Sequence, residues 1–256
     1  MNKPAETIIL KLGGSVITNK NAEEGVVREE ALLQISREIS RYGGKMIIVH
    51  GAGSFGHTYA KKYGLDQQFD SEGVIVTHES VKKLAAIVVG SLNHFGVRAV
   101  AVHPMCCTIC KSGRIESMYL DNIKIMLERG FVPVLHGDVA MDTELGACIL
   151  SGDQIVSHLA KELFVTRLGL GSAEEGVLGI DGKPVPEITP RNFEEFRSCI
   201  GASESTDVTG GMFGKVCELL ELSKTSCITS YIFNARKADN VYRFLSGESI
   251  GTKISP

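Results

Sequence analysis

The chain has 256 residues, which is enough for one large domain or for two closely packed lobes. Its composition, 43% hydrophobic and 22% charged, is typical of a soluble globular protein. The formal net charge of -3 argues against a nucleic-acid or membrane surface, so an anionic ligand must be bound by a local cluster of lysines and N–H groups. The N-terminal stretch lacks the apolar core of a signal peptide and no apolar run approaches a membrane span, so we expect a cytoplasmic protein.

Apolar periodicity predicts strands and helices that alternate along the chain. The expected strands cover residues 7–10, 46–49, 97–102, 131–135, 163–170, 227–233 and 251–254. The expected helices cover residues 28–42, 77–95, 121–129, 212–223 and 236–245. A further helix ends near residue 162 after a cap at Ser151 or Asp153, and a hairpin fits the loop after residue 102. This alternation predicts an α/β fold with a mostly parallel sheet covered by helices on both faces.

Three of the seven cysteines crowd together at Cys106, Cys107 and Cys110. A zinc site would need a second pair of ligands at a suitable spacing, and the sequence offers none. We therefore expect reduced, mostly packed thiols and no metal site built from protein side chains.

A glycine-rich turn follows the second expected strand. The apolar run 46–49 precedes Gly51-Ala52-Gly53-Ser54-Phe55-Gly56, and His57 comes next. Glycines let the backbone approach a bound group and direct N–H groups toward it, and the N-terminus of a following helix adds to the attraction for an anion. The pattern predicts a phosphate site at a strand-to-helix turn, with His57 at its rim.

Two common phosphate-binding motifs fit this chain poorly. A dinucleotide fold carries its G-x-G-x-x-G after the first strand and an acidic residue at the end of the next strand. Here the glycines follow the second strand, and Asp70 and Glu72 lie in a polar stretch that is no strand. A Walker A loop that ends in Gly214-Lys215 would need a glycine at position 209, where this chain has a threonine. We therefore disfavour a dinucleotide-dependent oxidoreductase and exclude a Walker A loop.

Three lysines lie beside glycine-rich or loop segments at the ligand-binding edge of the expected sheet. Lys11 ends the first strand, Lys20 follows in the next loop, and Lys215 lies in the first turn of a helix. Phosphoryl transfer needs cations and N–H donors around the moving group and little covalent chemistry from the protein. Because these positive charges repel one another, a carboxylate among them would be stabilising, and Asp153 is the best placed candidate.

Four motifs in this order resemble the amino acid kinase superfamily: Lys11-Leu12-Gly13-Gly14-Ser15, His50-Gly51-Ala52-Gly53, Ser151-Gly152-Asp153 and Thr206-Asp207-Val208-Thr209-Gly210-Gly211-Met212-x-Gly214-Lys215. Within the superfamily, Ser54-Phe55-Gly56-His57, the run 10–18 and Lys20 resemble the isopentenyl phosphate kinases. The match covers nearly the whole chain. The resemblance implies a three-layer αβα sandwich with a mostly parallel central sheet, a requirement for ATP and for Mg²⁺ held mainly through the phosphates, and a homodimer. It also implies ATP-dependent phosphorylation of isopentenyl phosphate to isopentenyl diphosphate, in an alternative mevalonate pathway of isoprenoid biosynthesis.

The resemblance implies roles for individual residues as well. The expected catalytic residues are Lys11, Lys20, His57, Asp153 and Lys215. The residues expected to bind the acceptor phosphate are Gly51, Gly56, His57 and Gly152. Those expected to bind ATP are Lys11, Gly13, Gly14, Ser15, Ala52, Asp153, Gly211 and Lys215. A single domain over residues 1–256 would then contain an acceptor half, about 1–162, and a nucleotide half, about 163–256.

Two positions depart from the family pattern. Residues 172–176 read Ser-Ala-Glu-Glu-Gly, where the family more usually has Thr-Asp-x-x-Gly. The loop 175–178 is therefore expected to help seat the nucleotide, without an assignment for adenine or ribose. Ala52 replaces a glycine of the turn, a change that a backbone role tolerates.

The chemistry of a phosphate acceptor agrees with this interpretation. A phosphate monoester has a second pKa near ~6, so it is mostly dianionic at neutral pH and needs no general base. It needs a donor that holds it in line with the γ-phosphate, and His57 fits that role. His50 and His136 are expected to bond to neighbouring backbone, and the helix around 81–92 to be either plain core or the wall of an isoprenoid pocket.

Two alternative functions stay open. One is a related kinase of the superfamily that acts on a phosphonate of the fosfomycin type or on an amino acid. A carboxylate acceptor would call for Arg or Asn residues placed to bind it, and the sequence identifies none. The other is a non-catalytic nucleotide-binding regulator, against which the three lysines and Asp153 favour catalysis.

Overall fold

The central strand of the main sheet is β1 (Thr7–Leu12), whose six residues are all buried. A strand of this kind is covered on both faces, as in parallel sheets. β1 pairs in parallel with β2 (Lys45–His50) on one side and with β9 (Val165–Ser172) on the other. The computed structural model describes residues 7–19, 25–201, 211–226 and 228–256.

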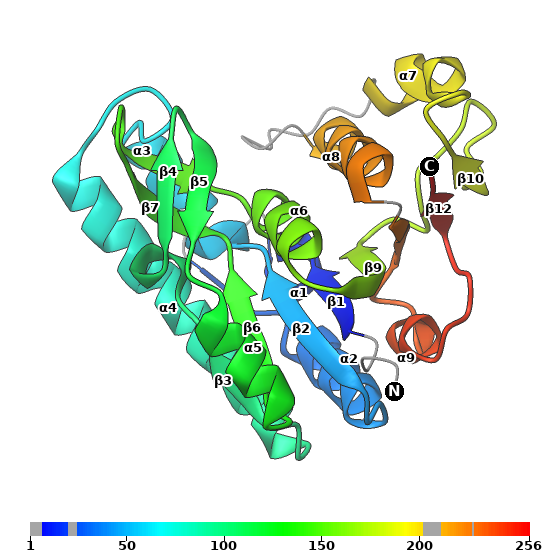
Figure 1. Cartoon of the computed structure of the whole chain (residues 1–256), viewed down its shortest axis with the longest axis horizontal. Helices are drawn as coiled ribbons and strands as arrows, with labels where there is room; N and C mark the ends of the chain where they lie inside the picture. The colour runs from blue at the N-terminus through cyan, green and yellow to red at the C-terminus, as the bar shows by residue number, and fades with distance from the viewer. Residues whose placement is uncertain (1–6, 20–24, 202–210, 227) are drawn as a thin grey trace.

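In these residues the main sheet contains eight strands in the order β10-β12-β11-β9-β1-β2-β6-β3 (Figure 1). The remaining members are β3 (Ala99–Ala101), β6 (Val132–His136), β10 (Glu187–Ile188), β11 (Thr229–Asn234) and β12 (Thr252–Ile254). Neighbouring strands are parallel except for β11 and β12, which are antiparallel. The predicted mostly parallel sheet is confirmed.

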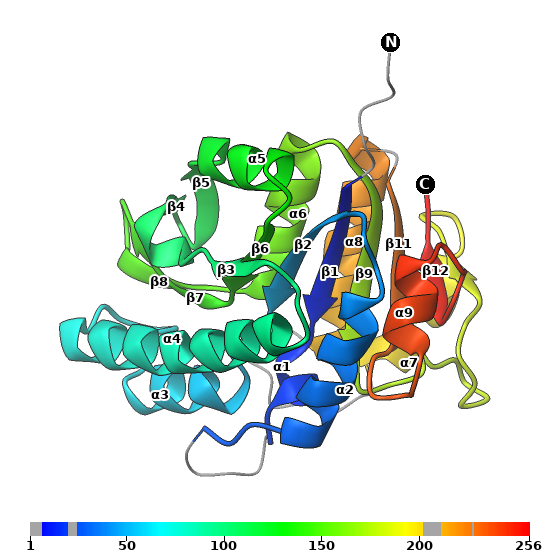
Figure 2. The same ribbon diagram turned by 90° about the horizontal axis from the view of Figure 1, so that it is seen from below.

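Helices cover both faces of this sheet (Figure 2). One face carries α2 (Glu29–Ser40), α4 (Ser71–His94) and α9 (Asn240–Leu245), and the other carries α5 (Asp121–Glu128), α6 (Gly152–Glu162) and α8 (Gly211–Ser226). Successive residues of β1 enter opposite cores, since Ile8 and Leu10 pack with the first set of helices and Ile9 packs with the second. The three-layer αβα sandwich is therefore confirmed.

A second sheet lies beside α3 (His57–Lys62) and one end of α4 (Figure 1). Its strands follow the order β5-β4-β7-β8. They are β4 (Thr108–Lys111), β5 (Arg114–Met118), β7 (Asp138–Asp142) and β8 (Gly146–Leu150). The β4–β5 hairpin was expected, but the β7–β8 hairpin was not. β7 also pairs in parallel with β4, a contact between segments far apart in sequence that local periodicity does not reveal.

Two helices begin at residues other than those expected. α4 begins at Ser71 rather than at 77, because the Asp70 carboxylate accepts a hydrogen bond of 2.6 Å from the Gly73 N–H and caps the earlier start. α9 begins at Asn240 rather than at 236, after Asp239, which has a φ of 64°. Periodicity also missed β10 and α7 (Phe193–Gly201).

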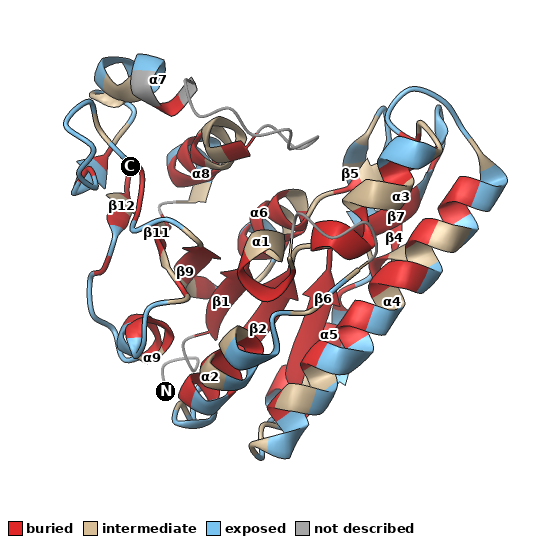
Figure 3. Ribbon diagram, turned by 180° about the vertical axis from the view of Figure 1, so that it is seen from behind, coloured by how far each residue is buried: buried red, intermediate tan, exposed pale blue. Residues whose placement is uncertain are grey.

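Buried and exposed residues alternate along α4, as expected of a helix with one face against the sheet (Figure 3). The buried set includes Val81, Leu84 and Val88, which belong to the core between the sheet and this helix layer. Among the described helices, none is long and apolar enough to cross a membrane.

Candidate active site

One cavity of about 700 Å³ lies at the carboxyl ends of β1, β2, β6 and β9, where parallel sheets commonly bind ligands. Its wall includes every predicted site residue that the structure describes: Lys11, Gly13, Gly14, Ser15, Gly51, Ala52, Gly56, His57, Gly152, Asp153, Gly211 and Lys215. Lys20 lies outside the described residues. The fold thus brings the separate motifs to one cavity, and the individual roles stay predictions.

Two glycine turns in this wall are in direct backbone contact. A Cβ at Gly14 would lie 2.5 Å from the backbone N of Gly53, and one at Gly51 would lie 2.6 Å from the backbone N of Gly14. Gly53 also has a φ of +53°, in the left-handed region that glycine favours. These positions therefore exclude side chains so that the turns after β1 and β2 can pack together beside the cavity.

Thr18 joins the same two turns and was not singled out from the sequence. Its hydroxyl donates a hydrogen bond of 2.8 Å to the Gly14 carbonyl and accepts one of 3.2 Å from the Ser54 N–H. Thr18 is completely buried, just beyond α1 (Gly14–Ile17). This residue fixes the relative position of the two turns through one side-chain oxygen.

Lys11 and Asp153 form a buried ion pair in the cavity wall. Lys11 Nζ lies 2.6 Å from Asp153 Oδ1, and the two side chains are 6% and 11% exposed. Asp153 is placed by the start of α6, where the Ser151 hydroxyl accepts a hydrogen bond of 3.2 Å from the Gln154 N–H. Ser151, rather than Asp153, is therefore the cap of this helix, which leaves the Asp153 carboxylate for the lysine.

Lys215 brings a second cation to the cavity. It lies in the first turn of α8, and its Nζ donates a hydrogen bond of 2.9 Å to the carbonyl of Gly211, the first residue of that helix. Gly211 has a φ of +57°. Because Lys215 folds back over the start of its own helix, its charge lies beside N–H groups that also attract anions.

His57 begins α3 and lies half-buried at the edge of the cavity. Gly56 precedes it, and a Cβ there would collide with the Cβ of Ala52 and lie 3.2 Å from the Val81 side chain. Gly56 thus has a packing reason for being glycine, in addition to its expected role at a phosphate. That close approach sets the direction in which α3 leaves the turn.

One end of the cavity is mainly apolar and contains residues that sequence reasoning missed. Its lining includes Ala60, Thr77, Val81, Val139 and Ile149. In the helix around 81–92, Val81 lines the cavity while Leu84, Val88 and Leu92 lie in the core. The expectation of core is confirmed, and the expectation of an isoprenoid pocket stays a prediction. Gly137 and Asp138 connect this apolar end to the glycine turns. For Gly137 and Asp138, the only signal in the sequence was their position directly after an expected strand.

The opposite end of the cavity includes the loop after β9. Its lining residues there are Ser172, Ala173, Glu174, Gly176, Val177 and Leu178. Glu174 N–H donates to the Ser172 hydroxyl at 3.0 Å, and Val177 N–H donates to the Thr252 hydroxyl at 2.8 Å, so this loop is held by side chains. Its seating of a nucleotide stays a prediction.

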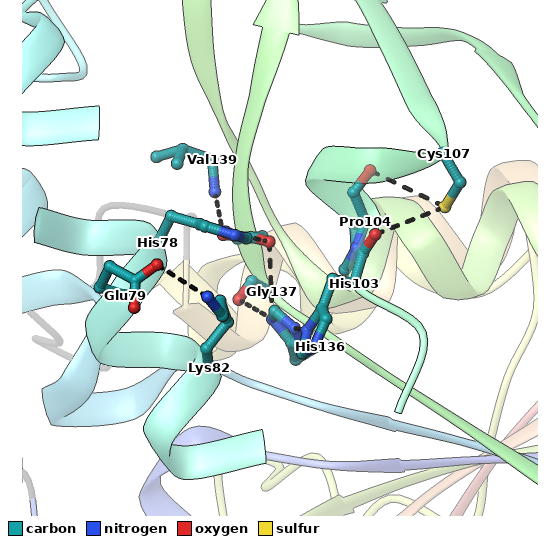
Figure 4. A network of polar contacts seen from close by, with 10 residues as sticks. His78, Glu79, Lys82, His103, Pro104, Cys107, His136, Gly137 and Val139 are labelled. Atoms are coloured by element: carbon teal, nitrogen blue, oxygen red, sulfur yellow. Dashed lines mark hydrogen bonds and ion pairs between the residues drawn. The ribbon is translucent and has the colours of Figure 1, made fainter. Parts of the chain in front are cut away.

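Buried imidazoles lie next to the glycines that follow β2 and β6. His136 Nδ1 lies 3.1 Å from the Gly137 carbonyl oxygen (Figure 4). His50 Nδ1 lies 3.1 Å from the carbonyl oxygen of Gly51, so both histidines bond to neighbouring backbone as predicted. Burial lowers the pKa of each imidazole to about 4. Both rings are therefore neutral at pH 7, and a neutral ring facing a carbonyl oxygen carries its proton on Nδ1.

The donor set suits a magnesium ion that is held mainly by phosphates. No group of three or more His, Cys, Asp or Glu side chains that could hold a metal occurs in the described residues. Mg²⁺ is usually bound by one or two carboxylates together with substrate phosphates, and Asp153 is a carboxylate in the cavity wall. The residues present therefore fit an ion that arrives with a nucleotide.

The fold and the site agree with comparisons to known proteins. The model of the amino acid kinase family matches residues 6–234. The chain belongs to the amino acid kinase family.

Within this family, curated relatives named isopentenyl phosphate kinase are similar over nearly the full length. The protein of Methanothermobacter thermautotrophicus is 37% identical, with 97% of this chain and 98% of the relative covered. The protein of Haloferax volcanii is 39% identical, with 96% and 98% covered. A solved structure of an isopentenyl phosphate kinase superposes with a TM-score of 0.85 at 33% identity and covers 98% of this chain.

Proposed function

We propose that this protein transfers the γ-phosphoryl group of ATP to isopentenyl phosphate, which gives isopentenyl diphosphate and ADP in isoprenoid biosynthesis. Relatives with this name match the chain at 33–39% identity over nearly its full length. The structural observation that carries the proposal is one cavity in which a cationic, glycine-lined centre adjoins an apolar end. Such a cavity fits a substrate with a phosphate head and a hydrocarbon tail.

The acceptor occupies the half of the site built from the first part of the chain, about residues 1–162. Its phosphate lies against Gly51, Gly56 and Gly152, where backbone N–H groups and His57 are donors. Its hydrocarbon tail lies along Val81 and Val139, which offer an apolar surface in place of water.

ATP occupies the half built from about residues 163–256, together with the turn after β1. Its phosphates contact Lys11 and Lys215 and backbone N–H groups of the segments at Gly13 and Gly211. Asp153 orients Lys11 through the ion pair of 2.6 Å. Ala52 and Ser15 approach the same phosphates from the two neighbouring turns.

The reaction requires positioning more than proton transfer. An oxygen of the dianionic acceptor phosphate attacks the γ-phosphorus, the new P–O bond forms, and the bond to the β-phosphate oxygen breaks as ADP leaves. His57 holds the acceptor in line with the leaving group, while Lys11 and Lys215 offset the charge that develops between them. The phosphates of ATP would hold most of the coordination of a bound Mg²⁺, which would supply further positive charge beside Lys11 and Lys215.

We also propose a homodimer. α4 exposes Ile75 and Ile87, and the edge strand β3 exposes Val100. A second copy of the chain could cover such exposed apolar side chains, which supports the proposal. Light scattering of the purified protein tests this, with the mass of two chains expected and that of one chain contradicting it.

A comparison of acceptors tests the proposed function. We expect ADP release with isopentenyl phosphate, and slower or no release with fosfomycin, glutamate or UMP; dimethylallyl phosphate measures tolerance of the tail. Turnover of glutamate or fosfomycin in preference to isopentenyl phosphate would instead support a different kinase of the family. Binding of ATP without turnover of any acceptor would support a regulator.

A further inference from the structure

Two walls of the apolar end of the cavity are joined by one polar pair. α4 contributes Thr77 and Val81 to the lining, and β7 contributes Val139. His78 follows Thr77 directly and Asp138 precedes Val139 directly. His78 Nδ1 lies 3.0 Å from each carboxylate oxygen of Asp138, which itself lines the cavity, so the pair bridges α4 and β7 at the cavity wall (Figure 4).

Asp138 depends on this contact because it is removed from water. Its side chain is completely buried, whereas that of His78 is 17% exposed. The carboxylate accepts one further hydrogen bond, of 2.9 Å, from the Val139 N–H. A buried carboxylate that loses its charged partner is strongly destabilising, so the pair holds together more firmly than a surface contact.

His78 is the histidine of this network whose protonated form is favoured. The hydrogen bond to Asp138 raises the pKa of His78. Burial lowers the pKa of His103 and of His136. His103 Nδ1 lies 2.8 Å from His136 Nε2, so these two neutral rings bond to each other, and His136 Nδ1 lies 3.8 Å from Asp138.

Among the described residues, the other charged groups that act on His78 are on its own helix. Glu79 and Lys82 flank it and pair with each other at 2.7 Å on the solvent side. They have small and opposite electrostatic effects on His78. Asp138 is therefore the group that determines its protonation.

We infer that His78 and Asp138 form a positioning pair that fixes the spacing of α4 and β7, and thereby the width of the compartment for the acceptor's tail. This inference rests on the proposed function, which places the tail between these walls. The pair acts through Val81 and Val139 rather than by touching the reacting atoms. A fixed spacing favours a short tail, because wider walls would leave gaps beside it that forfeit packing contacts.

The test compares His78→Phe, which removes the polar pair, with His78→Asn, which keeps a neutral donor near the position of Nδ1. His94→Phe, an exposed histidine at the end of the same helix, is the matched control. We expect His78→Phe to raise the KM for isopentenyl phosphate by roughly tenfold, the effect of about 1.4 kcal/mol on a binding equilibrium. The KM for ATP should not change, and His78→Asn should have an intermediate effect.

The same variants should change the preference for tail length. We expect kcat/KM for geranyl phosphate, relative to isopentenyl phosphate, to rise in His78→Phe and to stay unchanged in His94→Phe. An equal rise in the KM values for ATP and acceptor, or an unchanged preference in folded His78→Phe, would overturn the positioning pair. Wild-type protein that turns over no isopentenyl phosphate would overturn the proposed function and the pair with it.

A second measurement does not depend on the folding of the Phe variant. As pH rises past the raised pKa of His78, the charge on His78 is lost and the acceptor KM should increase. His78→Asn has no titrating group there, so that part of the pH dependence should disappear from its profile. Identical pH profiles of wild type and His78→Asn would overturn the inference.

Discussion

Lys11 Nζ lies 2.6 Å from Asp153 Oδ1, in a cavity wall where the two side chains are 6% and 11% exposed. The pair joins the end of β1 to the first turn of α6, and so connects the central strand to the helix beside the glycine turns. A carboxylate held at a lysine keeps the lysine directed before the phosphates arrive, which is the preorganisation that phosphoryl transfer needs.

Removal of Asp153 should weaken folding as well as catalysis. Asp153→Ala leaves Lys11 without its partner in a buried position, so we expect the free energy of unfolding to fall by about 3 kcal/mol or more in urea titrations. Glu221→Ala breaks an exposed pair with Lys224 and should cost less than about 1 kcal/mol. Equal losses from the two substitutions would contradict the account of the buried pair.

His57 and Lys215 should have separable effects on the two substrates. We expect His57→Ala to lower turnover of isopentenyl phosphate by about 10²–10³-fold, the usual effect of a lost transition-state donor, and to leave ATP binding largely intact. Lys215→Ala should act chiefly on the use of ATP. Steady-state kinetics with each substrate varied in turn distinguish the two. Near-normal turnover in His57→Ala would contradict the role of His57 as a donor to the acceptor phosphate. A change in the kinetics of the acceptor alone in Lys215→Ala would contradict the assignment of Lys215 to the nucleotide.

Glycine substitutions should have opposite effects at two positions. Gly14→Ala places a Cβ 2.5 Å from the backbone N of Gly53, so the two turns must separate and we expect both stability and turnover to fall. Gly90→Ala, in an exposed part of α4 with open space for a Cβ, should stabilise the helix by about 0.5–1 kcal/mol. Thermal unfolding and an activity assay of both variants check this. A Gly14→Ala protein with wild-type stability would show that the contact between the turns is not tight.

Acid should destabilise the protein through its buried histidines. His50 and His136 have folded-state pKa values lowered to about 4, below their ordinary value of 6.5. Between these values the unfolded chain binds more protons, so the free energy of unfolding falls as pH is lowered from about 6.5 to about 4, by up to about 3 kcal/mol for each histidine. The pKa of His78 is raised in the folded protein, so its effect lies at higher pH. There the stabilisation that protonated His78 contributes to the folded state is lost as pH rises through the raised pKa.

Urea titrations at several pH values measure this effect. His136→Asn removes one titrating ring and keeps an N–H near the position of Nδ1, so its stability should depend less on pH between 4 and 6.5 than that of the wild type. An unchanged slope in His136→Asn would contradict the assignment of the acid loss to this ring.

The sequence predicted the parts of the site that local patterns specify. Strand-to-turn transitions placed Lys11, Gly51 and Asp153 at one edge of a parallel sheet, and the structure brings them to one cavity. The local sequence also predicted a cap at the start of α6. The choice between Ser151 and Asp153 depended on the hydrogen bond from the Gln154 N–H, which only the structure shows. These features depend on residues within a few positions of one another, so a linear pattern records them.

The apolar end of the site could not be predicted in the same way. Val139 and Ile149 lie on β7 and β8, a hairpin that joins a distant segment through the pairing of β7 with β4. The contact of His78 with Asp138 likewise joins residues 60 positions apart. Thr18 contacts both glycine turns, yet its place at the end of the run 10–18 did not predict these hydrogen bonds. Such positions depend on tertiary packing, which periodicity does not encode.

Phosphorus NMR of the purified protein with isopentenyl phosphate, ATP and Mg²⁺ tests the central claim most directly. We predict that the monophosphate signal is replaced by the two coupled signals of isopentenyl diphosphate, with one ADP formed for each acceptor consumed. ATP that stays intact, or that yields ADP and free phosphate while isopentenyl phosphate persists, would contradict the proposed function.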